Sequence, residues 1–148
     1  MAETLLWYDL ETFGRNPRSS RICQFAAVRT DYELNPVADP VSLFCRPSDD
    51  FLPEPEAAMI TGITPQYAAE HGLREAEFMA VVHEHLSAPG TCALGYNTLR
   101  FDDEFIRFGL YRCFHDAYER EYAGGNSRWD LLDIMRMLYA LQPDSLQW

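Results

Sequence analysis

The stretch LLWYDLETFG, residues 5–14, constrains the fold of this chain more than any other. Its apolar start is typical of a central β-strand, and two acids, Asp9 and Glu11, follow it. Strand side chains alternate between faces, so both acids project from one face at the end of the strand. Neighbouring carboxylates repel each other unless a cation is present. The pattern therefore favours a divalent-metal site, with a solvated strand end or two helix-capping acids as the alternative.

Length and composition indicate one globular domain. The 148 residues include 47% apolar and 14% aromatic residues, enough for a sizeable core. Neither a signal peptide nor an apolar run near the roughly 20 residues of a membrane span is present in the sequence. The four cysteines are scattered without a CxxC pair, which argues against a zinc site and a disulfide framework. We expect a cytoplasmic, monomeric protein with reduced thiols and no membrane contact.

The charge balance limits the partners of the chain. The formal net charge is −11, and all twelve cationic residues are arginines. Such a chain is poorly suited to broad, nonspecific binding of nucleic-acid phosphates. It still allows a local site where metal ions and a few arginines hold a nucleic-acid strand.

The order of the expected elements predicts an α/β fold. Alternation predicts three strands that form an antiparallel meander, and later segments predict helices and one more strand. Thr64 followed by Pro65 is a typical helix start. This order is typical of a ribonuclease-H-like mixed sheet flanked by helices, in which the fourth strand lies beside the first. The expected strands are 4–11, 22–33, 39–47 and 91–97, and the expected helices are 56–60, 65–71, one within 74–90, 99–114 and 129–141.

The second acidic cluster follows the fourth expected strand. Asp102 and Asp103 lie just inside the next helix, and the topology brings them close to Asp9 and Glu11. Carboxylates from two segments can hold two metal ions about 4 Å apart, the arrangement used for in-line phosphoryl displacement. Hard oxygen ligands suit Mg²⁺, for which Mn²⁺ can substitute.

Several strings together resemble bacterial exonuclease I, a member of the DEDD superfamily of 3′→5′ exonucleases. The strings ETFG and NSRWDLLD separate this family from proofreading exonucleases. The resemblance implies metal-dependent release of mononucleotides from the 3′ end of single-stranded DNA in repair and recombination, and an interaction with the single-stranded-DNA-binding protein. The strings that carry it are YDLETFGRNPRSSRICQFAAVRTD, ITGITP, LGYNTLRFDDEFIR and NSRWDLLDIMR.

The resemblance also implies roles for individual residues. Asp9, Glu11 and Asp102 match the catalytic metal ligands, and Asp103 is then a helix-start acid that interacts with the helix dipole. The resemblance places four consecutive residues around the 3′-terminal nucleotide, with core packing as an even alternative for Phe13. These are Glu11, Thr12, Phe13 and Gly14.

The resemblance also implies that four further residues contact the DNA strand. Aromatic rings and a few cations are the usual means of holding single strands. The alternatives are half-buried core tyrosines and surface ion pairs, and a structural ion pair is an equal alternative for Arg128. The four expected contacts are Arg107, Tyr118, Tyr122 and Arg136.

One part of the family pattern is missing. The family carries a general-base His and a last Asp, spaced H-x-x-x-x-D, after the segment that matches WDLLD. No histidine of this chain has that place or spacing, and Asp130 is interpreted as an N-terminal helix acid. We therefore expect residues 1–148 to be the N-terminal portion of a DEDD-type exonuclease domain, weak or inactive alone. Another DEDD nuclease acting on RNA or in proofreading, and a non-catalytic binding module, remain alternatives.

Overall fold

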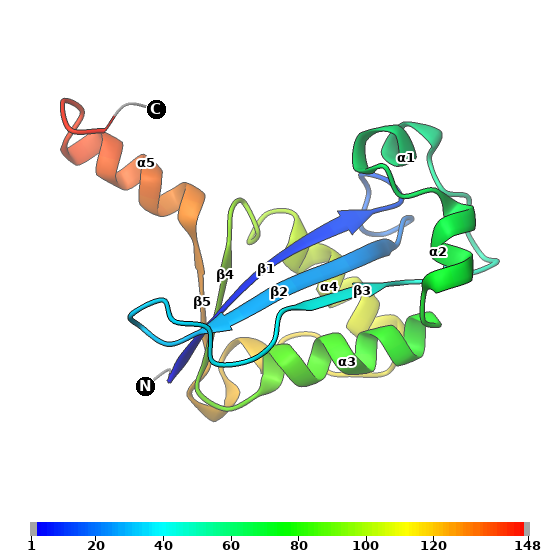
Figure 1. Ribbon diagram of the computed structural model, residues 1–148, viewed down its shortest axis with the longest axis horizontal. Helices are drawn as coiled ribbons and strands as arrows, with labels where there is room; N and C mark the ends of the chain where they lie inside the picture. The colour runs from blue at the N-terminus through cyan, green and yellow to red at the C-terminus, as the bar shows by residue number, and fades with distance from the viewer. Residues whose placement is uncertain (1–2, 147–148) are drawn as a thin grey trace.

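The fold is built on a five-stranded mixed sheet with the strand order β3-β2-β1-β4-β5 (Figure 1). A computed structural model describes residues 3–146. The central strand is β1 (Thr4–Thr12), which pairs antiparallel with β2 (Ile22–Thr30) and parallel with β4 (Thr91–Gly95). The edge strands are β3 (Val41–Phe44), antiparallel to β2, and β5 (Ser127–Asp130), parallel to β4. The expected ribonuclease-H-like mixed sheet is confirmed.

Five α-helices accompany the sheet in the described chain. The short helices α1 and α2 are confirmed, and Thr64 caps α2 by accepting a hydrogen bond from the Tyr67 amide. Two short 3₁₀ turns connect α4 to β5. The elements are α1 (Pro55–Thr61), α2 (Pro65–His71), α3 (Glu75–Ser87), α4 (Asp102–Arg112), η1 (Glu119–Glu121), η2 (Ala123–Gly125) and α5 (Leu131–Leu141).

The main core lies between one face of the sheet and helices α3 and α4. Leu6, Tyr8 and Leu10 of β1 alternate into this core. Asp9 and Glu11 have the opposite parity, so they project from the other face of the strand. Burial of the apolar side chains therefore fixes the direction in which the acids point. The helical core residues are Phe78, Met79, Val82 and Leu86 of α3, and Phe105, Ile106 and Leu110 of α4.

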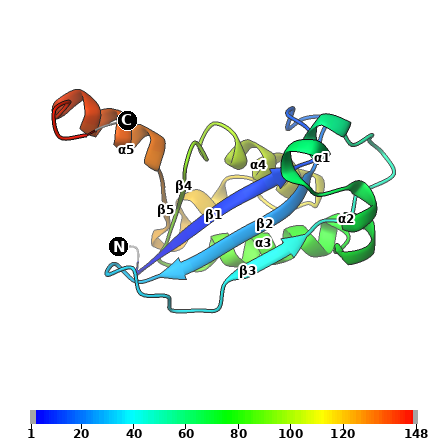
Figure 2. The same ribbon diagram turned by 45° about the horizontal axis from the view of Figure 1, so that its top comes forward.

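A second, smaller core lies under the segment that contains α1 and α2. It contains Phe13, Cys23, Ile63 and Ala68. Both ribbon views place α1 and α2 beside the carboxyl end of β1, at the opposite end of the molecule from α5 (Figures 1 and 2). All four cysteines are free, as expected, and burial raises the pKa of the Cys23 thiol to about 12.

The fifth strand was not predicted. Residues 127–130 pair in parallel with β4, from Cys92 opposite Ser127 to Gly95 opposite Asp130. The expected helix over 129–141 instead begins at Leu131, because the Asp130 side chain accepts a hydrogen bond from the Leu132 amide. A four-residue strand has too few side chains to show an alternating pattern, so its formation depends on β4 as a partner.

The last helix, α5, projects from the body of the molecule in both ribbon views (Figures 1 and 2). Several of its large apolar side chains are exposed, including Met137 and Leu141. None of the helices found in residues 3–146 combines the length and apolar character that crossing a membrane requires.

Gly95, the last residue of β4, allows the close approach of β4 to β1. A Cβ atom there would lie 2.5 Å from the carbonyl oxygen of Tyr8 and 2.4 Å from Cγ2 of Thr98. We predict that Gly95→Ala lowers the free energy of unfolding by about 1–3 kcal/mol, because backbone cannot move aside cheaply. Urea unfolding measures this change.

Gly109→Ala is the matched control, because its Cβ would meet the flexible end of Met79, with Sδ 2.8 Å away. Met79 can adjust and alanine favours the helix, so the loss there should be smaller. Equal losses at the two positions would contradict this explanation of Gly95.

Candidate active site

The candidate site forms where the first turn of α4 meets the end of β1. Parallel pairing between β1 and β4 ends at Trp7 and Leu94, although β1 continues to Thr12. Beyond that point the Leu10 amide donates a hydrogen bond to Oδ1 of Asp102, over 3.0 Å. Leu10 lies between the two β1 acids, so this bond brings Asp102 to the same strand end. The structure thus gathers the three predicted ligands, Asp9, Glu11 and Asp102, at one place.

The charge of Asp9 disfavours ionisation of the other two acids. Asp102 is 3% exposed. Its pKa is raised to about 7, mainly by burial and secondly by the charge of Asp9. Burial, followed by the same Asp9 charge, also raises the pKa of Glu11. Asp9 is therefore coupled to both of the other acids. A divalent cation near these oxygens would favour their charged forms and reverse the shifts.

The donor set fits a hard divalent cation in its chemistry. All three side chains offer carboxylate oxygens, the ligands that Mg²⁺ and Mn²⁺ prefer. In residues 3–146, no three His, Cys, Asp or Glu side chains are arranged closely enough to enclose an ion by themselves. Mg²⁺ ordinarily keeps several waters and uses only one or two protein carboxylates, so such an open arrangement suits it.

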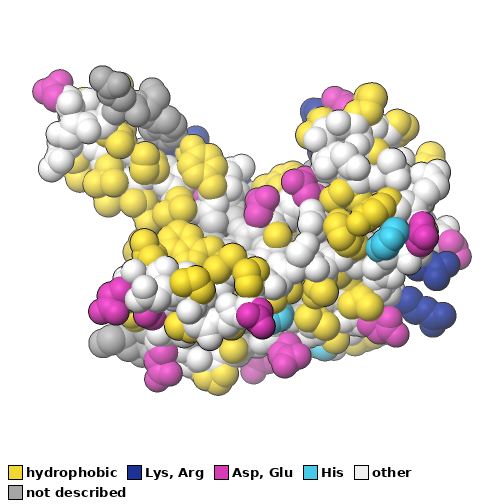
Figure 3. All heavy atoms as spheres, in the orientation of Figure 1, with side chains coloured by type: hydrophobic (Ala, Val, Ile, Leu, Met, Phe, Trp, Pro, Cys, Tyr) yellow, Lys and Arg dark blue, Asp and Glu magenta, His cyan; other side chains and the backbone are white. Residues whose placement is uncertain are grey.

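A cavity of about 290 Å³ adjoins Glu11. Glu11, Thr12 and Gly14 line it, together with residues of α1. The Thr12 hydroxyl donates a hydrogen bond to the Gly14 carbonyl oxygen, over 2.8 Å. A Cβ on Gly14 would lie 2.3 Å from Oε1 of Glu54, so glycine lets Glu54 occupy the cavity wall. Figure 3 shows the surface hollowed between α5 and the α1–α2 region, with acidic side chains exposed in the hollow.

Phe13 differs from its neighbours in the predicted nucleotide pocket. The side chain is 2% exposed and belongs to the second core, with its ring centroid 5.7 Å from that of Phe51. This placement matches the core alternative. A contact between Phe13 and a nucleotide remains untested.

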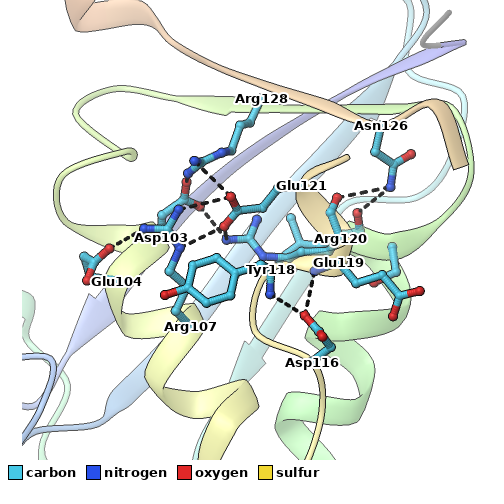
Figure 4. A network of polar contacts seen from close by, with 12 residues as sticks. Asp103, Glu104, Arg107, Asp116, Tyr118, Glu119, Arg120, Glu121, Asn126 and Arg128 are labelled. Carbon is cyan, nitrogen blue, oxygen red and sulfur yellow. Dashed lines mark hydrogen bonds and ion pairs between the residues drawn. The ribbon is translucent and has the colours of Figure 1, made fainter. Parts of the chain in front are cut away.

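Asp103 has a different environment from the one predicted for a helix-start acid. It does lie in the first turn of α4, but it is fully buried and accepts hydrogen bonds from Tyr8, Arg120 and Arg128 (Figure 4). Although burial alone would raise the pKa of Asp103, the Arg120 guanidinium holds it below its usual value. The expected dipole interaction is therefore secondary to a buried ion-pair cluster.

The predicted strand-contact residues lie in two regions. Arg107 is paired with Glu104 and Glu121, and its guanidinium lies 5.0 Å from the centroid of the Tyr118 ring. Tyr118 and Tyr122 are 57% and 69% exposed, which leaves ring faces open to a ligand. These contacts remain predictions.

Arg136 lies apart from these residues, on α5, within 3.5 Å of Asp133. The ion-pair alternative considered for Arg128 is confirmed, because Arg128 pairs with Asp103 and Glu121.

The four histidines contact other rings, and none of these contacts involves Asp9, Glu11 or Asp102. His71 stacks on Tyr67, His85 lies near Phe25, and the rings of His83 and His115 are 4.7 Å apart. Asp130 caps α5 and also accepts hydrogen bonds from the amides of residues 97 and 99. Its interpretation as a helix acid is confirmed.

Sequence reasoning missed Tyr8 and Arg120 as members of the site's surroundings. The alternation of β1 placed Tyr8 on the core face, and a buried tyrosine hydroxyl usually has a partner. That signal could have identified Tyr8. No comparable signal marked Arg120, because its partner Asp103 lies 17 residues away in the chain.

Comparison with known proteins identifies the family of this chain. A family model described as Exonuclease, RNase_T, matches residues 6–148. Exodeoxyribonuclease I of Escherichia coli (strain K12) is 51% identical over 145 residues, which cover 98% of this chain and 30% of that protein. An oligoribonuclease of Streptomyces avermitilis is 32% identical over 113 residues, covering 72% of this chain and 56% of that protein.

Solved structures show the same similarity. An exonuclease I from Methylocaldum szegediense has a TM-score of 0.94 and 59% identity, covering 98% of this chain and 31% of that one. An ExoI/SSB-Ct complex has a TM-score of 0.96, and a zinc-bound E. coli ExoI–ssDNA complex has a TM-score of 0.95. Both are 50% identical to this chain, covering all of it and 32% of those chains.

The fold and the family match thus define an exonuclease domain, and the chain belongs to the RNase_T exonuclease family. Within that family it resembles bacterial exonuclease I over nearly its whole length. The chain spans 30% of the length of the E. coli relative.

The raised pKa of Asp102 predicts a pH-dependent stability in the absence of metal. The folded chain holds a proton up to about pH 7, whereas the unfolded chain releases it near pH 3.8. Stability therefore falls as the pH rises from about 4 to about 7. The raised pKa of Glu11 also makes stability fall as the pH rises. The lowered pKa of His83 has the opposite effect on stability.

Asp102→Asn isolates the contribution of Asp102 and keeps an oxygen for the Leu10 amide. We predict that, with a chelator present, this variant is more stable than the wild type at pH 8, and that the difference shrinks toward pH 5. Urea unfolding at the two pH values measures it. A difference that does not change with pH would contradict the assignment.

Proposed function

We propose that this chain forms the N-terminal part of a metal-dependent 3′→5′ exonuclease domain that acts on single-stranded DNA. The supporting observation is the gathering of three carboxylates around Leu10, beside a cavity bounded by the segment after β1. The similarity to exonuclease I proteins, and the ssDNA complex among their structures, support single-stranded DNA as the substrate.

Asp9, Glu11 and Asp102 would hold Mg²⁺ in this proposal, with Mn²⁺ as a substitute and two ions in the complete site. Bound ions of this kind lower the pKa of an attacking water and stabilise the leaving oxygen. The chain's own residues would position the substrate. Glu11, Thr12 and Gly14 line the cavity for the terminal nucleotide, and Tyr118, Tyr122, Arg107 and Arg136 extend the strand contacts beyond it.

The general base and a fourth carboxylate must come from elsewhere in the proposed enzyme. The four histidines of this chain are engaged at a distance from the acids, and Asp130 is used as a helix cap. We propose that a following segment of the exonuclease domain supplies both groups in a longer protein that also carries later domains, and that the 148-residue chain alone is weak or inactive. The ExoI/SSB-Ct complex among the similar structures supports the single-stranded-DNA-binding protein as a partner.

A second candidate is an RNA-directed nuclease of the same superfamily. The oligoribonuclease similarity favours it, although that match is weaker and covers less of the chain. A metal-independent binding module is a third candidate from a different class. The net charge of −11 counts against it, because a chain so acidic binds nucleic acid poorly without cations.

A digestion ladder separates these functions. The substrates are 5′-labelled single-stranded DNA and an RNA of the same sequence, incubated with Mg²⁺ and either this chain or one extended past Trp148. We predict a DNA ladder from the extended chain that a chelator abolishes. An RNA ladder alone would favour the second candidate, and metal-independent retention without cleavage would favour the third.

The metal ligands can be tested in the extended chain. We predict that Asp9→Ala reduces the rate of DNA degradation by on the order of 10³-fold or more, since loss of metal binding removes several kcal/mol of transition-state stabilisation. Asp39→Ala removes an exposed acid from the β2–β3 connection and should leave the rate unchanged. An active Asp9→Ala enzyme would contradict the assignment of the metal ligands.

A further inference from the structure

Asp103 is adjacent to the proposed ligand Asp102 but occupies a different environment. Its side chain is fully buried, and the Tyr8 hydroxyl donates a hydrogen bond to Oδ1 over 2.7 Å. Arg120 donates to the same oxygen over 2.7 Å, and Arg128 donates to Oδ2. Both oxygens of Asp103 are therefore satisfied by the protein, which leaves Asp102 as the acid of this pair that faces Asp9.

Charge balance explains how Asp103 remains ionised in the core. Arg120 is 1% exposed at its side chain, and Arg128 also pairs with Glu121 over 2.9 Å. Toward the surface, Arg107 pairs with Glu121 and Glu104 (Figure 4). Three carboxylates and three guanidiniums thus form one compensated cluster, and buried charges persist only when they are paired in this way.

One side-chain contact takes the place of strand pairing at the end of β1, and a second lies next to it on the core face. After Trp7, the edge of β1 that faces β4 is no longer paired with β4 by backbone hydrogen bonds. On this edge the Leu10 amide donates to Asp102, and from the core face the Tyr8 hydroxyl donates to Asp103, so consecutive acids of α4 hold residues on either side of Asp9. The position of Asp9 relative to Asp102 depends on both bonds.

We propose that Tyr8 and Asp103, supported by Arg120 and Arg128, are positioning residues that set the placement of Asp102 against β1. The metal-binding consequence rests on the proposed function, whereas the placement itself does not. Removing a hydrogen-bond partner behind metal ligands typically weakens metal affinity by about 10- to 100-fold.

Tyr8→Phe tests the placement directly. It removes one hydroxyl, keeps the ring in the core, and leaves Asp103 paired with both arginines. We predict that hydrogen exchange of the Leu10 amide becomes about tenfold faster, because its bond to Asp102 opens more often. The reference is the Leu6 amide, which lies in the sheet between Arg29 and Ala93 and should change less.

Two outcomes of the hydrogen-exchange measurement would contradict the positioning role. Equal acceleration at Leu6 and Leu10 would mean that the Tyr8 hydroxyl only stabilises the whole fold, which would overturn the proposal. No change at Leu10 would overturn it as well.

Mn²⁺ titration by calorimetry provides the second readout, on the chain extended past Trp148. We predict that Tyr8→Phe and Arg128→Met each weaken Mn²⁺ binding by about tenfold. Arg112→Met is the matched control, because Arg112 is similarly exposed at 21% and pairs with Glu75 at the far end of α4. Unchanged affinity in Tyr8→Phe, or an equal loss in Arg112→Met, would overturn the positioning role.

The two measurements also separate this proposal from the proposed function. If the wild-type chain extended past Trp148 does not bind Mn²⁺ while Leu10 exchange responds locally to Tyr8→Phe, the metal site is wrong and the positioning role stands. If Mn²⁺ binds but Leu10 exchange is unaffected, the metal site stands and the positioning role fails.

Discussion

The hydrogen bond from the Leu10 amide to Asp102 is the contact on which the candidate site depends. It joins the first turn of α4 to a part of β1 that β4 no longer pairs with. Without it, Asp9 and Glu11 would be two acids on an open strand face. With it, a third carboxylate comes to the same place, although burial and like charge both oppose its ionisation. The arrangement therefore has an electrostatic cost that a divalent cation would relieve.

Two adjacent acids of α4, Asp102 and Asp103, differ in their chemistry because they lie in different surroundings. Asp103 points into the protein, where Arg120 and Arg128 neutralise it. Among the described residues, Asp102 has no ion-pair partner, and it instead accepts a hydrogen bond from a backbone amide. One of the two thus stabilises the junction between α4, β5 and β1, while the other is left for a ligand. Helix geometry is sufficient for this division, since consecutive residues project about 100° apart.

Much of the fold and the three acids could be predicted from the sequence, because they depend on local patterns. Alternation in β1 placed Asp9 and Glu11 on one face, and the strand order brought Asp102 to them. β5 could not be predicted, since four residues form a strand only beside β4. Nor could the pairing of Arg107 with Glu121, which joins residues of α4 and η1. Long-range ion pairs leave no periodic signal in one sequence, so the acids that pair with Arg107 and Arg128 could not be named from it.

The most direct test of the metal site is a crystal of the chain extended past Trp148, soaked in Mn²⁺ and measured for anomalous scattering. We predict an anomalous peak within coordination distance, about 2.0–2.3 Å, of carboxylate oxygens of Asp9, Glu11 or Asp102. A crystal of Asp9→Ala treated in the same way should lack that peak. A wild-type crystal with no manganese at this end of β1, or with manganese bound only elsewhere, would contradict the account.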